Sequence, residues 1–256
     1  RKVFESEKTL SNISEIKQGL ATCNNDKFLR LWFEVSNCNS NFYCKEREIT
    51  KEKPQKWFPY NKGGGYRNWY GNNNFLVNWK NDGLEIHEYS KIPLDYSGAP
   101  VRAKDFYFKS GITYGLISSY GFSARFVPTG YIFDVGGSMI FPEIDLKGMT
   151  GFLCSKIAKT NISSLNPTLN FQVGDVKRLP FNKNCLESIK NNSRECIDIA
   201  KKDWDSYETS WDFLSLPLKD FAQESLNLES TYQNLREYWR TTTNEMLILE
   251  KGINKM

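Results

Sequence analysis

Basic and amide side chains recur among aromatic residues in the first half of the chain, and these residue types can read DNA. Arg and Lys donate hydrogen bonds to guanine O6 and N7, Asn and Gln pair with adenine N6 and N7, and backbone amides in Gly-rich turns can hold phosphates. The strongest candidates are donors on expected loops or strand ends. These candidate DNA-binding residues are Lys17, Gln18, Asn24, Asn25, Lys27, Lys62, Arg67, Asn68, Arg102, Lys104 and Arg125.

Each candidate also has a purely structural interpretation. An Asn can form a turn, and a Lys can be an ordinary solvated side chain. Arg125 lies in a segment, 122–126, that alternates like a strand, so its guanidinium can instead pair with Asp134 inside the β body. The nearby aromatics favour core packing over stacking on bases; they are Trp57, Trp69, Tyr70 and Trp79.

The elements for methyl transfer are missing. An amino-group DNA methyltransferase holds the flipped base with Asn or Asp followed by Pro-Pro and an aromatic residue, and no Pro-Pro occurs here. The nearest string, at 166–168, reads Asn-Pro-Thr and predicts a turn. The glycines at 63–65 precede aromatics and Asn, whereas a cofactor-binding glycine turn precedes a helix. We therefore predict no catalytic residue and no cofactor in this chain.

Histidine and cysteine form no metal-binding pattern. His87 is the single histidine, and we expect an ordinary strand or surface residue there. The closest pair of the six cysteines, Cys38 and Cys44, is too widely spaced for a zinc knuckle. We predict reduced structural thiols and no metal.

Charge is distributed unevenly along the chain. Residues 1–202 carry 29 Lys and Arg against 20 Asp and Glu, whereas residues 203–256 carry 5 against 10. A basic body with an acidic tail suits a polyanion-binding module joined to a part that faces protein, although a basic solvated surface is the alternative.

Residues 10–182 are rich in aromatic and β-branched residues broken by Gly, Asn and Pro, which predicts short strands and turns. Residues 151–159 have the apolar spacing of a short helix, and we expect a closing strand at 170–180. The clearest strand candidates are 75–79, 111–117, 124–127, 131–135 and 138–141.

After Pro180 the pattern becomes helical. From Phe221 to Ile253 the positions follow a strict 4-3 alternation that is mostly apolar, which predicts one long helix packed on another, with Gly252 weakening its end. The prediction is an α+β fold: a mainly β target-binding domain over 1–182 with a short helix, then a helical spacer or bundle over 183–256. No apolar run approaches twenty residues and no signal segment is present, so we expect a soluble, cytoplasmic fragment with no membrane partner.

Several long strings are specific enough to suggest a family. The first are KQGLATCNNDKFLR at 17–30 and KWFPYNKGGGYRNWYG at 56–71, and others cover 75–83, 122–130, 133–137, 165–175 and 203–213. Together they resemble the PglX family, the adenine-specific DNA methyltransferases of BREX phage-defence systems, over nearly the whole chain.

The resemblance implies a parent enzyme that methylates adenine N6 at a short non-palindromic site and so marks host DNA. The catalytic half of that family, with its S-adenosyl-L-methionine-binding and Asn-Pro-Pro-Tyr elements, has no counterpart here, so the chain resembles the carboxyl-terminal, target-recognition portion. Double-stranded DNA would be its partner, and the N-terminal methyltransferase domain of the same protein would bind the cofactor and the flipped adenine. Residues 151–180 also resemble recognition domains of type I specificity subunits, whose helices act as spacers.

Two other functions remain open, a protein-interaction scaffold and a carbohydrate-binding module. As a scaffold, the acidic helical tail can dock other BREX proteins. In either case the basic body can attract a phage-made DNA mimic. A carbohydrate-binding module is suggested only by Trp and Tyr near Asn at 66–74, and the basic body argues against it.

Overall fold

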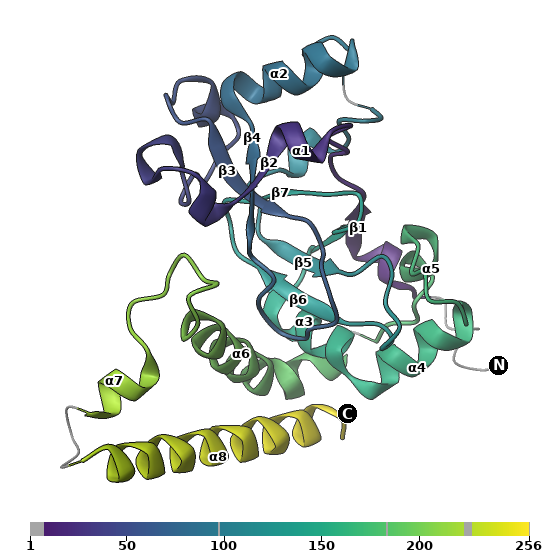
Figure 1. Cartoon of the computed structure of the whole chain (residues 1–256). Helices are drawn as coiled ribbons and strands as arrows, with labels where there is room; N and C mark the ends of the chain where they lie inside the picture. The colour runs from purple at the N-terminus through teal and green to yellow at the C-terminus, as the bar shows by residue number, and fades with distance from the viewer. Residues whose placement is uncertain (1–7, 97, 183, 223–226, 256) are drawn as a thin grey trace.

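The computed structural model describes residues 8–96, 98–182, 184–222 and 227–255. In this part of the chain, two four-stranded sheets are combined with helices, and the longest helix lies at the C-terminal end (Figure 1). The predicted α+β fold with a long C-terminal helix is confirmed.

The first sheet is antiparallel and has the order β1-β8-β5-β6. Its centre pairs Ile112 with Phe126 on one side and with Ile140 on the other. All residues of β5 are buried, because the strand is internal and both its faces are covered. The bounds are β1 (Ser14–Lys17), β5 (Gly111–Tyr114), β6 (Ala124–Val127) and β8 (Met139–Pro142).

The second sheet has the order β2-β4-β3-β7. Its first three strands are antiparallel, whereas β7 runs parallel to β3 and pairs Ile132 with Tyr60. The bounds are β2 (Leu29–Leu31), β3 (Trp57–Asn61), β4 (Phe75–Asn78) and β7 (Ile132–Phe133).

The helices divide between the two sheets. In Figure 1, α1 and α2 lie at the end of the molecule near the second sheet, and α3 and α6 lie beside the first sheet. The α-helices are α1 (Asn25–Phe28), α2 (Lys80–Ser90), α3 (Leu146–Cys154), α4 (Lys156–Leu165), α5 (Val173–Lys177), α6 (Asn184–Asp205), α7 (Pro217–Ala222) and α8 (Leu228–Ile253). The 3-10 helices are η2 (Leu10–Asn12), η3 (Trp32–Glu34), η4 (Asn37–Asn39), η5 (Glu48–Lys51) and η6 (Lys104–Phe106).

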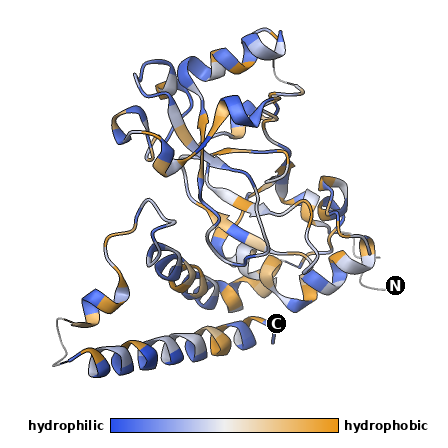
Figure 2. Ribbon diagram, viewed as in Figure 1, coloured by the Kyte–Doolittle hydropathy of each residue, from blue (hydrophilic) through white to orange (hydrophobic). Residues whose placement is uncertain are grey.

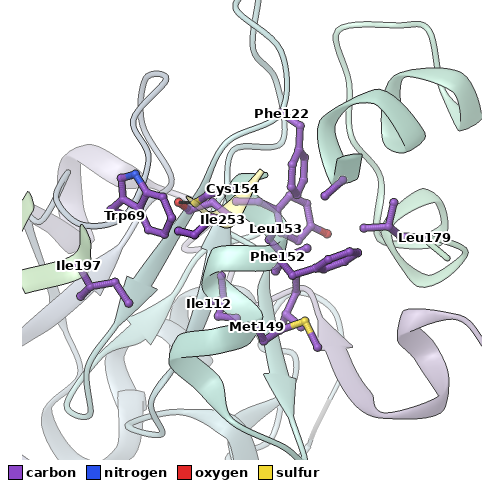
Figure 3. Close-up of a cluster of buried hydrophobic side chains, with 14 of the residues drawn as sticks. Trp69, Ile112, Phe122, Met149, Phe152, Leu153, Cys154, Leu179, Ile197 and Ile253 are labelled. Carbon is purple, nitrogen blue, oxygen red and sulfur yellow. Dashed lines mark hydrogen bonds between the residues drawn. The ribbon is translucent and has the colours of Figure 1, made fainter. Parts of the chain in front are cut away.

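Two hydrophobic clusters form the core. One gathers around the second sheet and includes Phe58, Trp79 and Phe133. The other joins the first sheet to α3, α6 and α8, and Figure 3 shows Ile197 of α6 and Ile253 of α8 in the same cluster as Ile112 and Phe122. Figure 2 shows hydrophobic residues on the strands, whereas α8 is hydrophilic over much of its length.

The strand predictions are largely confirmed. Strand β6 has the predicted bounds, and the bounds of β4 and β8 lie within one residue of the prediction. Strand β5 ends three residues before the predicted end at 117, and β7 covers only two residues of the predicted segment 131–135. The predicted closing strand at 170–180 is wrong: the segment contains α5, and only isolated bridges occur at Asn170 and Pro180. The alternation there was too short to distinguish a strand from a one-turn helix.

The helix predictions need three corrections. The short helix at 151–159 is two helices, because Ser155 ends α3 and caps α4 by accepting from Ala158 N at 3.2 Å. The long helix does not begin at Phe221: that residue belongs to α7, Ser225 lies outside the described residues, and α8 begins at Leu228 behind the cap Asn227. Helix α2 was not predicted, and it places His87 in the core, 1% exposed, rather than on a strand or the surface.

The boundary at residue 182 stays a prediction, although side chains from both sides of it share one hydrophobic cluster. Among the described residues, no helix combines the length and the apolar character needed to cross a membrane.

Candidate nucleic-acid interface

Three predicted DNA-binding residues line one shallow groove. Lys17 and Gln18, at the end of β1, line the groove together with Arg102, which lies in the loop before η6. Gln172, at the start of α5, lines it as well. Lys17 Nζ lies 5.0 Å from the centre of the Phe106 ring and forms an ion pair with Glu15 at 2.7 Å. This hydrogen bond and charge hold the pKa of Glu15 below its ordinary value. The groove is thus lined by two cations, two amides and an aromatic ring, together with the carboxylate of Asp105, and one of the cations, Lys17, is already paired with Glu15.

Lys62 directly follows β3 of the second sheet and is paired with Asp134. Its Nζ is 3.8 Å from Asp134, and Asp134 pairs with Leu20, two residues beyond Gln18. The buried Tyr60 hydroxyl lies 2.9 Å from Leu20 O and 2.6 Å from an Asp134 carboxylate oxygen. Burial raises the pKa of Tyr60 well above its ordinary value, so this phenol stays a fixed donor.

A glycine contact sets the position of the loop that carries Lys62. A Cβ on Gly137 would lie 2.6 Å from both Asn61 O and Gly63 N, closer than any real side chain approaches. The two loops therefore touch through their backbones, and Lys62 projects from this junction with its side chain about one-third exposed.

Asn24, Asn25 and Lys27 gather at α1, where the two amides have local structural roles. Asn24 Oδ1 accepts from Lys27 N at 3.0 Å and so caps the helix, and Asn25 Oδ1 accepts from the Thr22 hydroxyl at 2.7 Å. Lys27 Nζ lies 5.0 Å from the centre of the Tyr89 ring and is exposed. Of this group, Lys27 is the cation available to a ligand.

Arg67 and Asn68 are turned toward α6. Arg67 donates to Tyr70 O and to Asp203, both at 2.8 Å, and its guanidinium lies 5.0 Å from the centre of the Trp204 ring. Asn68 Oδ1 is buried and lacks a hydrogen-bond partner. Arg67 therefore joins the 61–74 loop to α6, and its charge is already paired.

Two of the predicted contacts are corrected by burial. Arg125 is fully buried and donates to Gly63 O at 2.6 Å and to Arg67 O at 3.3 Å. Its proposed partner Asp134 contacts Tyr60 and Lys62 instead, so the structural interpretation of Arg125 holds but with carbonyl partners. Burial lowers the pKa of Arg125 to about 10.

Lys104 is 3% exposed, and its Nζ donates to Leu94 O and lies 3.3 Å from His87 Nε2. Burial lowers the pKa of Lys104. Neither Lys104 nor Arg125 reaches the surface in this packing: Arg125 lies between the buried Ala124 and the half-buried Phe126, whereas Lys104 is buried although the adjacent Asp105 is exposed.

Three of the four aromatic residues that were expected to pack in the core are buried. Trp69, Tyr70 and Trp79 are buried, which confirms core packing, and Trp57 lies on β3 beside the guanidinium of Arg30 at 5.6 Å. Sequence reasoning missed the exposed Tyr120, whose ring lies 6.1 Å from that of the exposed Tyr66 in the segment 66–74. Lys159 on α4 was also missed, and its Nζ donates to the Tyr66 hydroxyl at 3.0 Å.

The described residues contain no group of three or more His, Cys, Asp or Glu side chains placed to hold a metal ion. All six cysteines lie within these residues and are unpaired, as predicted. Burial raises the pKa of the Cys154 thiol to about 12, which makes it unreactive at neutral pH.

The sequence is similar to two curated adenine-specific methyltransferases. It is 33% identical over 235 residues to "Adenine-specific methyltransferase BrxX" of Escherichia coli O9:H4 (strain HS), and 32% identical over 256 residues to "Adenine-specific methyltransferase PglX" of Lacticaseibacillus casei (strain Zhang). The matches cover 90% and 96% of this chain but only 18% and 21% of the relatives. The resemblance seen in the sequence is thus confirmed, and the chain spans about a fifth of the length of these relatives.

No protein-family model matches the chain. Among solved structures, the Type IIL restriction-modification enzyme MmeI in complex with DNA has a TM-score of 0.48 and 13% identity, covering 97% of this chain and 33% of that one. A likeness of this size carries no functional argument.

Proposed function

We propose that this chain is the part of a longer adenine-specific DNA methyltransferase that recognises double-stranded DNA. The similarity to PglX and BrxX covers nearly all of this chain, whereas most of those proteins lies outside it. Methyl transfer would belong to the remainder, because the sequence has no Asn-Pro-Pro-aromatic string to hold a flipped adenine. S-adenosyl-L-methionine would bind there as well.

The observation that carries the proposal is that Lys17, Gln18 and Arg102 line one groove, and Lys62 is a further partly exposed cation. Cations on a surface can neutralise phosphates, which supply most of the sequence-independent affinity for DNA. An amide beside them can pair with a base edge. The arrangement matches what duplex binding requires, and none of these residues is buried in the core.

Salt-dependent binding is the first test. We expect the chain to bind fluorescein-labelled 20-base-pair duplexes in an anisotropy assay, and the affinity to fall steeply between about 50 and 200 mM salt. The variants Lys17→Ala and Lys62→Ala should weaken binding to every duplex alike, each reducing the slope of log affinity against log salt by about 0.9 if it removes one phosphate contact. Lys190→Ala, on the α6 surface beside Glu187, is the matched control.

If the wild-type chain binds no duplex at 50 mM salt, the proposed function fails. If it binds but Lys190→Ala weakens binding as much as Lys17→Ala does, then DNA binding is real but the groove is not its site.

A second function is favoured by a cleft between α6, α7 and α8. It has a volume of ≈ 1070 Å³ and is lined by aromatic side chains that include Trp211, Tyr238 and Trp239, with Leu214 beside them 94% exposed. Large exposed apolar patches mark protein-binding surfaces. A docking role predicts that a protein recovered with the tagged chain after nuclease treatment is lost when Leu214 and Trp239 are changed to Asp; equal recovery by both forms would rule it out.

A further inference from the structure

Two loop segments, one at the end of the predicted strand 111–117 and one at the start of the predicted closing strand 170–180, pair with each other near the groove. Ser118 N donates to Leu169 O at 3.0 Å, Phe171 N donates to Leu116 O at 2.7 Å, and Ile117 lies opposite Asn170. We call residues 116–120 and 168–172 the loop platform. Since two backbone hydrogen bonds, which form one antiparallel bridge, connect two segments far apart in sequence, the platform is a defined surface rather than two separate loops.

The platform is fixed to the core from below. Phe171 is 2% exposed and meets the buried Phe122 ring edge-on, with the ring centres 5.5 Å apart. Both rings belong to the hydrophobic cluster that contains α3 and α6. Because the platform backbone is already held in place, binding a ligand would cost little additional backbone entropy in these loops.

The outer face of the platform is unusually apolar for a loop surface. Tyr120 is 83% exposed, Ile117 67% and Leu169 57%, and Tyr66 lies beside Tyr120. Exposed apolar side chains gathered in one place indicate a binding surface.

Amides lie along the same platform. Gln172 Nε2 donates to Asn170 Oδ1 at 2.8 Å, and the Gln172 residue is exposed. This contact uses one Gln172 N–H and the Asn170 Oδ1, so the second Gln172 N–H and the Asn170 N–H groups can donate to acceptors on a base edge. Gln172 also lines the groove of Lys17 and Arg102, so platform and groove are continuous.

Cations lie on two sides of the platform. Lys17 and Arg102 lie across the groove from Gln172, and Lys159 lies against Tyr66 next to Tyr120. A DNA duplex presents the matching pattern, with phosphates along the edges of a groove whose floor offers base edges and apolar surfaces. Apolar side chains set among cations also act as wedges between base pairs.

We propose that the loop platform is the element that contacts the bases, with Asn170 and Gln172 reading a base edge and Tyr120 stacking on or between bases. The surrounding cations, Lys17, Lys62, Arg102 and Lys159, hold the phosphates. This inference rests on the proposed function of DNA recognition, and it assigns sequence discrimination to residues that differ from those that provide general affinity.

Selection from a randomised duplex pool separates the two roles. The chain is mixed with 20-base-pair duplexes carrying a random central segment, and bound duplexes are sequenced over several rounds. We expect the wild type to enrich a motif, Gln172→Ala and Asn170→Ala to relax the preference at one or two positions by about 5- to 150-fold, and Lys62→Ala to enrich the unchanged motif with weaker binding.

Tyr120 is tested with the enriched duplex itself. Tyr120→Ala should weaken binding while leaving the salt slope unchanged, whereas Tyr120→Phe should retain binding because the ring remains. Unfolding midpoints equal to wild type are expected for both, since the side chain is 83% exposed, and they show that a loss of binding is not a loss of fold.

The outcomes separate the inference from the proposed function. Binding without any enriched motif, or platform variants that enrich the wild-type motif, would overturn the inference and leave DNA binding intact. Absence of binding by the wild-type chain would overturn both.

Discussion

Arg47 and Asp82 form a bidentate ion pair between η5 and α2. Arg47 Nε and Nη2 donate to the two carboxylate oxygens at 2.7 and 2.6 Å, and Asp82 is 2% exposed. The pairing raises the pKa of Arg47 further. Removing one partner leaves a buried charge, so we predict that Arg47→Met destabilises the chain by about 3–5 kcal/mol in urea unfolding.

A second substitution distinguishes the charge from the packing. Asp82 has φ 59°, a conformation that Asn tolerates well. The double variant Arg47→Met with Asp82→Asn should recover a large part of the lost stability, because no buried charge remains unpaired. Equal destabilisation of the single and double variants would instead assign the loss to the missing arginine stem.

His87 makes stability depend on pH. Burial and the neighbouring Lys104 lower the pKa of His87 below 6.5, while Asp82 opposes the shift. The unfolded chain then binds the proton more readily than the folded chain, so the stability that neutral His87 allows is present above the unfolded pKa and is lost as pH falls through about 6.5 toward the folded pKa.

We predict that wild-type unfolding midpoints in urea fall more steeply between pH 7 and pH 5 than those of His87→Gln, which cannot titrate. Parallel curves for the two proteins would show that the histidine binds protons equally in both states.

Individual residues of the candidate site show that residue type can be predicted from the sequence more readily than burial or exposure. Residue types that are able to contact DNA were identifiable, and Lys17, Gln18 and Arg102 do line one groove. Burial was only partly identifiable: the strand alternation around Arg125 allowed an interior guanidinium, whereas nothing in the sequence distinguished Lys104 from the surface cations, and tertiary packing takes both into the interior. The exposed Tyr120 was missed for the converse reason, since aromatic residues usually pack inside.

At the scale of elements, period-2 and helical patterns were reliable where one face is buried and the element is long. Strands β4 and β6 and helix α6 follow this rule, and the α6 face that was read as apolar is buried at Ile189, Ile197 and Ala200. Helices α2 and α5 were not predicted. Helix α5 has only five residues, and α2 has three positive-φ residues in its first turn that no periodicity reveals.

The contact between α3 and α6 depends on one glycine. A Cβ on Gly151 would lie 1.8 Å from Ser193 Oγ, and Ser193 is fully buried with its hydroxyl donating to Ile189 O. We predict that Gly151→Ala destabilises the chain by about 1–3 kcal/mol, because the two helices must move apart.

Gly174 in α5 is the matched control, since nothing lies within 4 Å of its Cβ position. There the same substitution should be neutral or stabilise by up to about 1 kcal/mol, from helix propensity alone. Urea unfolding measures both, and equal effects at the two positions would contradict the close approach of α3 to α6.

For the whole molecule, the decisive feature is that the helical C-terminal part and the first sheet share a core. Ile197 and Trp204 of α6 and Ile253 of α8 pack in the same cluster as Trp69 (Figure 3). Trp69 Nε1 also donates to Glu250 on α8 at 2.9 Å, and Asn254 accepts from Lys156 N at 2.7 Å. The change of pattern near residue 182 thus marks a change of element type within one packed cluster.

From this shared core we predict a single cooperative unfolding transition for the full chain, with the first sheet and α6 equally protected in hydrogen exchange. A chain truncated after residue 182 would expose the apolar face of α3 that α6 covers, and we expect it to lose near-ultraviolet circular dichroism and to unfold without a sharp midpoint. If the truncated chain instead unfolds at the wild-type midpoint, and α6 exchanges at least about tenfold faster than β5, then residues 1–182 fold alone and the helical part is an independent spacer.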